Sequence, residues 1–201
     1  MILLDIYTVL EIISVIFGVL YLVLMVKENI WCWIFGILSS VITIYLYTHV
    51  TLYLEAGLNF YYILAGFYGW IYWYKHQSKN KKTPVIEWKT HYHIINISSG
   101  IALSLILGYI MHQFTDSHRP YIDASITVFS FSATYLEARK VLSTWYYWFI
   151  LNATSIGLMI DRELYFFSAL SVFYTIMCVV GFIQWRKTLR SQNEKSYTIS
   201  K

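Results

Sequence analysis

Charged side chains are scarce in this sequence. Asp, Glu, Lys and Arg make up 13% of its 201 residues, whereas about a quarter of a soluble domain is charged. Hydrophobic residues make up 58% and aromatic residues 19%. The apolar residues also come in blocks about as long as a membrane span, roughly 20 residues. This composition excludes an ordinary soluble domain and predicts an integral membrane protein.

Cysteines and catalytic motifs are scarce too. Cys32 and Cys178 lie in apolar blocks, where we expect them to be small buried hydrophobic residues, so no disulfide or redox motif follows. The sequence has no HExxH and no GxSxG motif. His91 and His93 could touch a metal, but no acidic or cysteine partner stands at ligand spacing. We therefore expect no catalytic residues, no metal site and no cofactor, and an enzyme is a disfavoured class.

The apolar blocks predict about seven membrane-spanning helices. Their expected bounds are 6–26, 31–49, 53–74, 94–112, 123–137, 142–160 and 164–185. The fifth block is rich in hydroxyl groups and should face other helices or a cavity rather than lipid. The first block lacks a basic start and a cleavage site, so we interpret it as a mature helix. We expect one all-α membrane domain over residues 1–187 and a cytoplasmic tail over 188–201.

Basic residues are distributed unevenly between the loops. Of the 15 Lys and Arg residues, all but Arg119 and Arg162 fall in one set of alternate segments. The positive-inside rule places that set in the cytoplasm, with the N-terminus outside and the C-terminus inside. We interpret the basic loop KHQSKNKKT as a topology signal rather than as a binding patch for nucleic acid. We therefore expect contact with membrane lipid and no nucleic acid partner.

The sequence contains a weak internal repeat. WIFGILSSVITIYLY (33–47) aligns with WFILNATSIGLMIDR (148–162). After a three-residue gap, residues 52–73 align with 164–185, which pairs Gly69 with Gly181 and Trp73 with Trp185. The copies begin four spans apart and so cross the membrane in the same direction. This predicts a first repeat (6–74), a linker helix (94–112) and a second repeat (123–185), an arrangement of transporters whose site lies between the halves.

Polar and aromatic residues recur on one face of the predicted helices. In the third helix they are Asn59, Tyr62, Gly66, Gly69 and Trp73, and the seventh repeats the spacing with Ser171, Tyr174, Cys178, Gly181 and Trp185. The glycines allow close helix approach, the outer polar and aromatic groups can line a cavity, and the terminal tryptophans fit interfacial belts.

The stretch WYYWFILN adds a second such face. Trp145, Trp148 and Asn152 stand at i, i+3 and i+7 and therefore look the same way. An amide in hydrocarbon needs a partner, so Asn59 and Asn152 are either cavity residues or helix-contact residues.

Several of these stretches resemble the PnuC family of bacterial vitamin transporters. They are NIWCWIFGILSSVITIYLY, LYLEAGLNFYYILAGFYGWIYW, DASITVFSFSATYLEARKVLSTW, WYYWFILNATSIGL and LYFFSALSVFYTI. The resemblance runs from roughly residue 9 to 187. It implies a SWEET-like three-one-three fold, a homotrimer, and facilitated diffusion of nicotinamide riboside, or of thiamine or riboflavin in sister subgroups. A cytoplasmic kinase would trap the substrate by phosphorylation.

The resemblance also implies where the substrate binds. Trp145, Trp148 and Asn152 match the family's core motif, while Asn59 and Thr134 stand where nicotinamide riboside members usually have glutamine. The expected substrate contacts are Trp145, Trp148, Asn152, Asn59, Trp33, Tyr62, Tyr174 and Thr134. Indole faces attract a cationic ring by roughly 0.5–2 kcal/mol without burying a counter-charge. Nicotinamide riboside and thiamine are both flat cations, so these residues leave the choice between them open.

Acidic residues deep in a span would indicate ion coupling. Asp123, Glu137, Asp161 and Glu163 lie at span ends, and Glu11, about a third of the way into the first span, is the best candidate. Because the other acids lie at span ends rather than deep in the spans, the sequence favours passive transport into the bacterial cytoplasm. Other seven-helix classes fit less well: the last span has no lysine for a retinal Schiff base, and a seven-helix receptor would not be expected to show a parallel repeat. A seven-helix membrane sensor or binding protein is the alternative from another class, and uptake of substrate into vesicles would distinguish it from a transporter.

Overall fold

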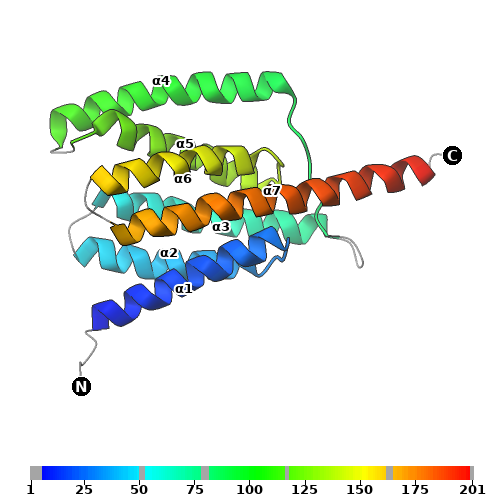
Figure 1. Cartoon of the computed structure of the whole chain (residues 1–201), viewed down its shortest axis with the longest axis horizontal. Helices are drawn as coiled ribbons and strands as arrows, with labels where there is room; N and C mark the ends of the chain where they lie inside the picture. The colour runs from blue at the N-terminus through cyan, green and yellow to red at the C-terminus, as the bar shows by residue number, and fades with distance from the viewer. Residues whose placement is uncertain (1–5, 50–52, 78–81, 116–117, 162–164, 200–201) are drawn as a thin grey trace. The chain divides into compact units, whose positions relative to one another are not determined.

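The computed structural model describes residues 6–49, 53–77, 82–115, 118–161 and 165–199. Within them the regular secondary structure is helical, apart from one isolated bridge between Ile86 and Val141. The helices, drawn in Figure 1, are α1 (Ile6–Val26), α2 (Cys32–His49), α3 (Tyr53–His76), α4 (Thr90–Phe114), α5 (Pro120–Ala138), α6 (Thr144–Asp161) and α7 (Tyr165–Ile199). Each predicted span is thus occupied by one helix. The prediction of an all-α fold with seven helices is confirmed.

The predicted bounds are accurate except at the end of the chain. α7 continues as one helix to Ile199, through the polar segment that we predicted as a tail, because that segment holds few helix breakers. Four helical stretches in the described residues are long and apolar enough to cross a membrane by length and composition: α1, α2, α4 and Ser168–Lys195. α5 begins with Pro120 in its first turn, where proline's fixed φ suits a helix.

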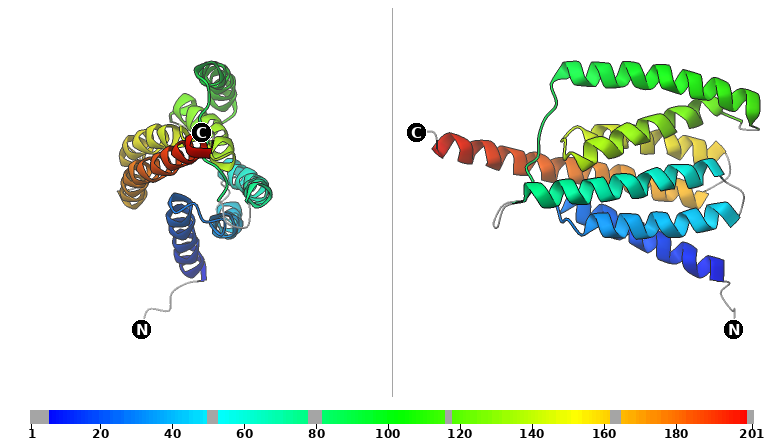
Figure 2. Two further views of the ribbon diagram at one scale, coloured as in Figure 1. Left: turned by 90° about the vertical axis from the view of Figure 1, so that its right-hand side faces the viewer. Right: turned by 180° about the vertical axis from the view of Figure 1, so that it is seen from behind.

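The chain divides into two compact units, Met1–Pro84 and Val85–Lys201. In the first unit, α2 packs against both α1 and α3. In the second unit each helix from α4 to α7 packs against the next, and Figure 2 shows α4 running alongside α5. Large apolar side chains cover the outer face of α4: Ile94, Ile95, Ile101, Leu103, Leu105 and Ile106 are all more than half exposed. Such a face is suited to hydrocarbon rather than water.

The same helix ending occurs in both units, 112 positions apart in the sequence. Glu28 follows α1 with a φ of 58°, and Lys140 follows α5 with a φ of 57°. The amides of Glu28 and Asn29 donate to the carbonyls of Met25 and Leu24 at 2.9 Å each. The corresponding bonds after α5, from Lys140 to Glu137 and from Val141 to Leu136, are also 2.9 Å. This is the Schellman motif, in which glycine is the usual residue at the left-handed position.

A tryptophan lies against a glycine and a second tryptophan in each unit. The rings of Trp33 and Trp73 meet edge to face at 5.6 Å, and those of Trp145 and Trp185 meet in the same way at 5.1 Å. A Cβ added to Gly69 would stand 2.4 Å from the Trp33 ring. One added to Gly181 would stand 2.4 Å from the Trp145 ring. The prediction that these glycines allow close helix approach is confirmed.

The repeat alignment was therefore wrong by three residues in its second helix. The helix endings and the tryptophan contacts pair Trp33 with Trp145, at the same spacing of 112 that pairs Gly69 with Gly181. We had paired Trp33 with Trp148. The sequence allowed the error because Trp145 and Trp148 both precede similar apolar residues, and only the contact with Gly181 distinguishes them. With this correction the repeat needs no gap.

Candidate substrate-binding site

An acidic side chain and an indole meet in the second unit. The Nε1–H of Trp148, on α6, donates to Oε2 of Glu137 on α5 at 3.2 Å. Glu137 is 2% exposed, and Trp148 is partly buried. The bond holds one edge of the indole, because Nε1–H donates to a side chain that is itself buried. Sequence reasoning assigned Glu137 only to a span end and missed this contact.

Asn152 lies one helical turn beyond Trp148. Its Nδ2 donates to the backbone carbonyl of Trp148 at 2.8 Å and reaches Sγ of Cys178 on α7 at 3.7 Å. Cys178 is 3% exposed, as the sequence predicted. Asn152 therefore makes a helix contact, which was one of its two predicted roles. Within the residues that the structure describes, no donor bonds its Oδ1, which can therefore act as an acceptor at the partly buried face that Asn152 shares with Trp148.

Trp33 and Trp145 are buried much more deeply. Trp33 is 2% exposed and Trp145 is 1% exposed, and both rings pack as described above. Neither indole Nε1 has a hydrogen-bond acceptor in the described part of the chain. A buried donor left unpaired costs about 1–3 kcal/mol, so each N–H is suited to bind a water or a substrate oxygen. Their role as substrate contacts remains a prediction.

The terminal tryptophans are not interfacial belts. Trp73 and Trp185 are both 0% exposed, whereas a belt residue needs an open face toward headgroups. The contacts of their rings with Trp33 and Trp145 explain the burial. Their positions in the sequence, beside the basic loops, suggested interfacial tryptophans. The sequence does not show whether a ring points outward or into the helix packing.

The remaining predicted contacts are divided between the units. Asn59 and Tyr62 are partly buried on α3, where the Tyr62 ring lies 6.1 Å from that of Tyr61. Tyr174 is partly buried on α7. Thr134 is 4% exposed, and its hydroxyl donates to the carbonyl of Ser130 at 2.8 Å. The hydroxyl of Thr134 is thus bonded to its own helix, while the other three side chains are partly exposed.

The acid, indole and amide of the second unit have no counterpart in the first. At the positions 112 residues earlier, the first unit has Met25 in place of Glu137, Gly36 in place of Trp148 and Ser40 in place of Asn152. Met25 is fully buried, and a Cβ on Gly36 would approach the Tyr21 ring at 2.8 Å. The shared residues, such as Trp145 and Gly181, build the common scaffold. Glu137, Trp148 and Asn152 are therefore not part of the scaffold that the two units share.

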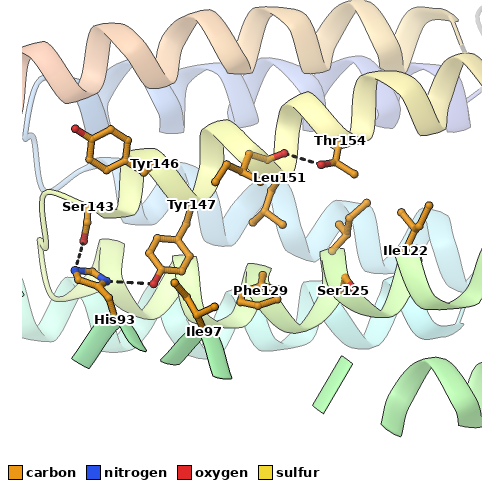
Figure 3. Close-up of a pocket in the computed structure, with 12 residues that line it drawn as sticks. His93, Ile97, Ile122, Ser125, Phe129, Ser143, Tyr146, Tyr147, Leu151 and Thr154 are labelled. Atoms are coloured by element: carbon orange, nitrogen blue, oxygen red, sulfur yellow. Dashed lines mark hydrogen bonds between the residues drawn. The ribbon is translucent and has the colours of Figure 1, made fainter. Parts of the chain in front are cut away.

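The second unit also has a cavity of about 670 Å³. It lies among α4, α5 and α6 and is lined mainly by apolar side chains, with His93, Ser143 and Tyr147 among its polar ones. Figure 3 shows His93 between the other two: its ring nitrogens lie 3.2 Å from the Tyr147 hydroxyl and 3.3 Å from the Ser143 hydroxyl. No residue that we predicted as a substrate contact is among those that line it.

These observations define a class of protein. A chain whose described residues form seven helices, with large apolar side chains exposed on their outer faces and several stretches long enough to cross a membrane, has the architecture of a multi-pass membrane protein. The model of the nicotinamide mononucleotide transporter family matches residues 8–187. The chain belongs to this family, and it is a transporter rather than an enzyme.

Individual relatives agree with the family. The chain is 21% identical over 211 residues to "Nicotinamide riboside transporter PnuC" of Escherichia coli (strain K12), with 92% of this chain and 88% of that protein covered. The protein of the same name from Shigella flexneri gives the same values. A solved structure, "Crystal structure of the Vitamin B3 transporter PnuC", superposes with a TM-score of 0.75 at 21% identity, covering 90% of this chain and 82% of the other. The predicted resemblance to PnuC is confirmed.

Proposed function

We propose that the protein takes up nicotinamide riboside across the bacterial cytoplasmic membrane by facilitated diffusion. The observation that carries the proposal is the Glu137–Trp148–Asn152 cluster, within a chain of a vitamin transporter family. Nicotinamide riboside combines a flat pyridinium cation with ribose hydroxyls and an amide. The indole face of Trp148 suits the cation. The Oδ1 of Asn152, and the buried N–H of Trp145 that has no acceptor in the described part of the chain, suit the polar groups.

Passive transport fits the positions of the acids. Glu11, the residue that we considered for ion coupling, is exposed on α1 rather than enclosed among helices. No cluster of three or more His, Cys, Asp or Glu residues that could hold a metal ion occurs in the part of the chain that the structure describes. Downhill entry would be made effectively irreversible by phosphorylation inside the cell. The basic loops support an external N-terminus and a cytoplasmic C-terminus. A homotrimer remains an expectation from the family.

Thiamine is the second candidate substrate. It is also a flat cation. In addition, the position that is usually glutamine in nicotinamide riboside members is Thr134 here, and its hydroxyl donates to a carbonyl of its own helix. Calorimetric titration of the purified protein with nicotinamide riboside, thiamine and riboflavin separates the candidates. We expect tight binding of nicotinamide riboside alone. Tight binding of thiamine alone would overturn the substrate and leave the proposed transport mechanism in place, and no binding of any vitamin would overturn the function.

A further inference from the structure

The cavity among α4, α5 and α6 is elongated along the helices. Ser143 lines one end of it and Thr154 the other, as Figure 3 shows. The chain between these two residues, almost all of it in α6, rises about 16 Å. Half of the hydrocarbon core of a bilayer is about 15 Å thick, since the whole core is roughly 30 Å. The cavity therefore extends over about the depth of one leaflet.

The cavity opens between α4 and α6. Within the described residues α4 and α6 both pack against α5 and not against each other. The side chains of Ile97 on α4 and of Tyr146 and Ile150 on α6 line the cavity and are exposed. In a membrane protein such exposed apolar side chains face hydrocarbon. An acyl chain can thus enter the cavity sideways from the bilayer.

Hydroxyl groups at one end of the cavity leave a proton to donate. The ring nitrogens of His93 lie 3.2 Å from the Tyr147 hydroxyl and 3.3 Å from the Ser143 hydroxyl. Nδ2 of Asn96 donates to the same Tyr147 oxygen. The two bonds of His93 use one proton each, whereas the two hydroxyls and a neutral imidazole hold three protons together. Within the described residues, at least one O–H is left for a further acceptor, such as a phosphate or ester oxygen.

Positive charge lies at the same end. Lys89 is exposed at the start of α4, one helical turn before His93. The first turn of α4 has no acidic residue and no side-chain cap, so its amides keep the positive end of the helix dipole. The exposed acid of this segment, Glu87, precedes the helix. With the proposed membrane orientation, this end lies at the cytoplasmic surface, where basic residues attract anionic lipid headgroups.

On these grounds we infer that the cavity binds one anionic phospholipid of the cytoplasmic leaflet. An acyl chain lies between α4 and α6, and the phosphate and ester oxygens meet the polar end at His93, Ser143 and Lys89. The lipid fills the space that helix packing leaves between α4 and α6 and so supports the position of α4. The inference rests on the proposed membrane orientation and is independent of which vitamin is carried.

Two pairs of variants test the chain and the headgroup separately. Ile97→Trp places an indole at the cavity wall, and Ile101→Trp is its matched control, because Ile101 lies one turn further along α4, is exposed and does not line the cavity. Lys89→Gln removes the charge at the polar end. Its control is Lys187→Gln, which removes an exposed lysine of α7. Full-length protein is stripped of lipid in detergent, incubated with equal amounts of phosphatidylglycerol and phosphatidylcholine, and analysed by native mass spectrometry.

The expected result is retention of a single phosphatidylglycerol per chain by the wild type. Ile97→Trp should lose it and Ile101→Trp should keep it. Lys89→Gln should lower the preference for phosphatidylglycerol about fivefold, equivalent to about 1 kcal/mol, and Lys187→Gln should not. Equal retention by the two tryptophan variants, equal preference in the two glutamine variants, or a wild type that retains no lipid or both lipids equally would overturn the inference. A change of oligomeric state in Ile97→Trp alone would also overturn it, since a second copy would then occupy the cavity.

A fold control keeps this test decisive. Each variant must elute as a single species, and Ile150→Trp, at the opposite wall on α6, replaces Ile97→Trp if that variant fails. Added phosphatidylglycerol should raise the midpoint of thermal unfolding of the wild type, because a ligand stabilises the state that it binds, and should leave that of the filled cavity unchanged. Equal rises would contradict the inference. A wild type that binds no vitamin but retains the lipid would overturn the proposed function alone.

Discussion

At the scale of single residues, the two units provide an internal comparison. Trp33, Gly69 and Trp73 in one unit make the same contacts as Trp145, Gly181 and Trp185 in the other. Contacts that occur in both units belong to the scaffold. Trp148 departs from this common pattern, since its position in the first unit is a glycine. We therefore propose Trp148 as the aromatic residue of this region that contacts the substrate.

Replacing Trp148 tests that assignment. Trp148→Ala should weaken binding of the transported vitamin by at least about tenfold, because the cation loses an aromatic face worth roughly 0.5–2 kcal/mol together with stacking area. Calorimetry on the purified variant measures this. Trp31→Ala is the matched control, because Trp31 is 59% exposed and should bind as the wild type does. Unchanged affinity in a well-folded Trp148→Ala protein would contradict the assignment.

Replacing Gly181 tests the scaffold. Gly181→Ala should lower stability by about 1–3 kcal/mol, the usual cost of overpacking, because its Cβ would stand 2.4 Å from the Trp145 ring. Gly157→Ala is the control: nothing lies within 4 Å of a Cβ there, and alanine favours a helix over glycine. Thermal unfolding in detergent compares the two variants. A Gly181→Ala protein as stable as Gly157→Ala would show that the ring moves aside freely.

The residues of the site could be predicted only in part. The shared face of Trp148 and Asn152 follows from helical spacing, and the structure places both side chains on a partly buried surface. Glu137 was missed because a residue at a span end is expected to reach water, whereas packing of α5 against α6 buries it. The rule that acids within membrane segments are candidates for function would have found it. The direction of a side chain at a helix end depends on its neighbours, which the sequence does not supply.

At the scale of helices, α4 is joined to the rest of its unit mainly through α5 and one polar cluster. The Tyr147 hydroxyl lies 3.2 Å from His93 and 3.2 Å from Nδ2 of Asn96, both on α4. Oδ1 of Asn96 in turn accepts from Ser132 on α5 at 3.0 Å. These bonds link three helices at one end of the cavity. Elsewhere α4 shows apolar side chains to its surroundings, so this cluster fixes its position along α6.

Removing the central hydroxyl should loosen α4. Tyr147→Phe deletes both bonds to α4, and each such interhelical bond contributes about 0.6–2 kcal/mol in membranes. The expected result is a lower midpoint of thermal unfolding and faster hydrogen exchange in the first turns of α4. The neighbouring Tyr146 is 56% exposed, so Tyr146→Phe should have little effect. Equal midpoints for the two variants would mean that Tyr147 adds nothing to the attachment of α4.

The positions of the helices were predicted well, whereas the alignment of the two repeats was not. Apart from the C-terminal end of α7, apolar blocks about as long as a span located every helix to within a few residues, because a spanning segment must satisfy its own backbone hydrogen bonds. The pairing of Trp33 with Trp148 failed because two apolar helices resemble one another at many offsets. The helix endings at Glu28 and Lys140 fix the correct alignment of the repeats. They could not be recognised in the sequence, because neither residue is the glycine that usually marks such an ending.

At the scale of the whole molecule, the chain is a membrane transporter built from two units that share local geometry. Seven helices, the family match over residues 8–187 and the structural similarity at a TM-score of 0.75 agree on this. Arg119 and Asp161 form a bidentate pair at 2.7 and 2.8 Å that joins the start of α5 to the end of α6. This hydrogen bond raises the pKa of Arg119. Because both side chains are nearly half exposed, the pair adds little stability.

The central claim is passive transport of a cationic vitamin through a site that contains Trp148. The most direct test is uptake of labelled nicotinamide riboside into liposomes that contain the purified protein and hold no ion gradient and no nucleotide. The account predicts saturable uptake that stops when inside and outside concentrations are equal, and a strong reduction in Trp148→Ala liposomes. Accumulation above the outside concentration when a proton or sodium gradient is imposed, or no uptake without one, would contradict it.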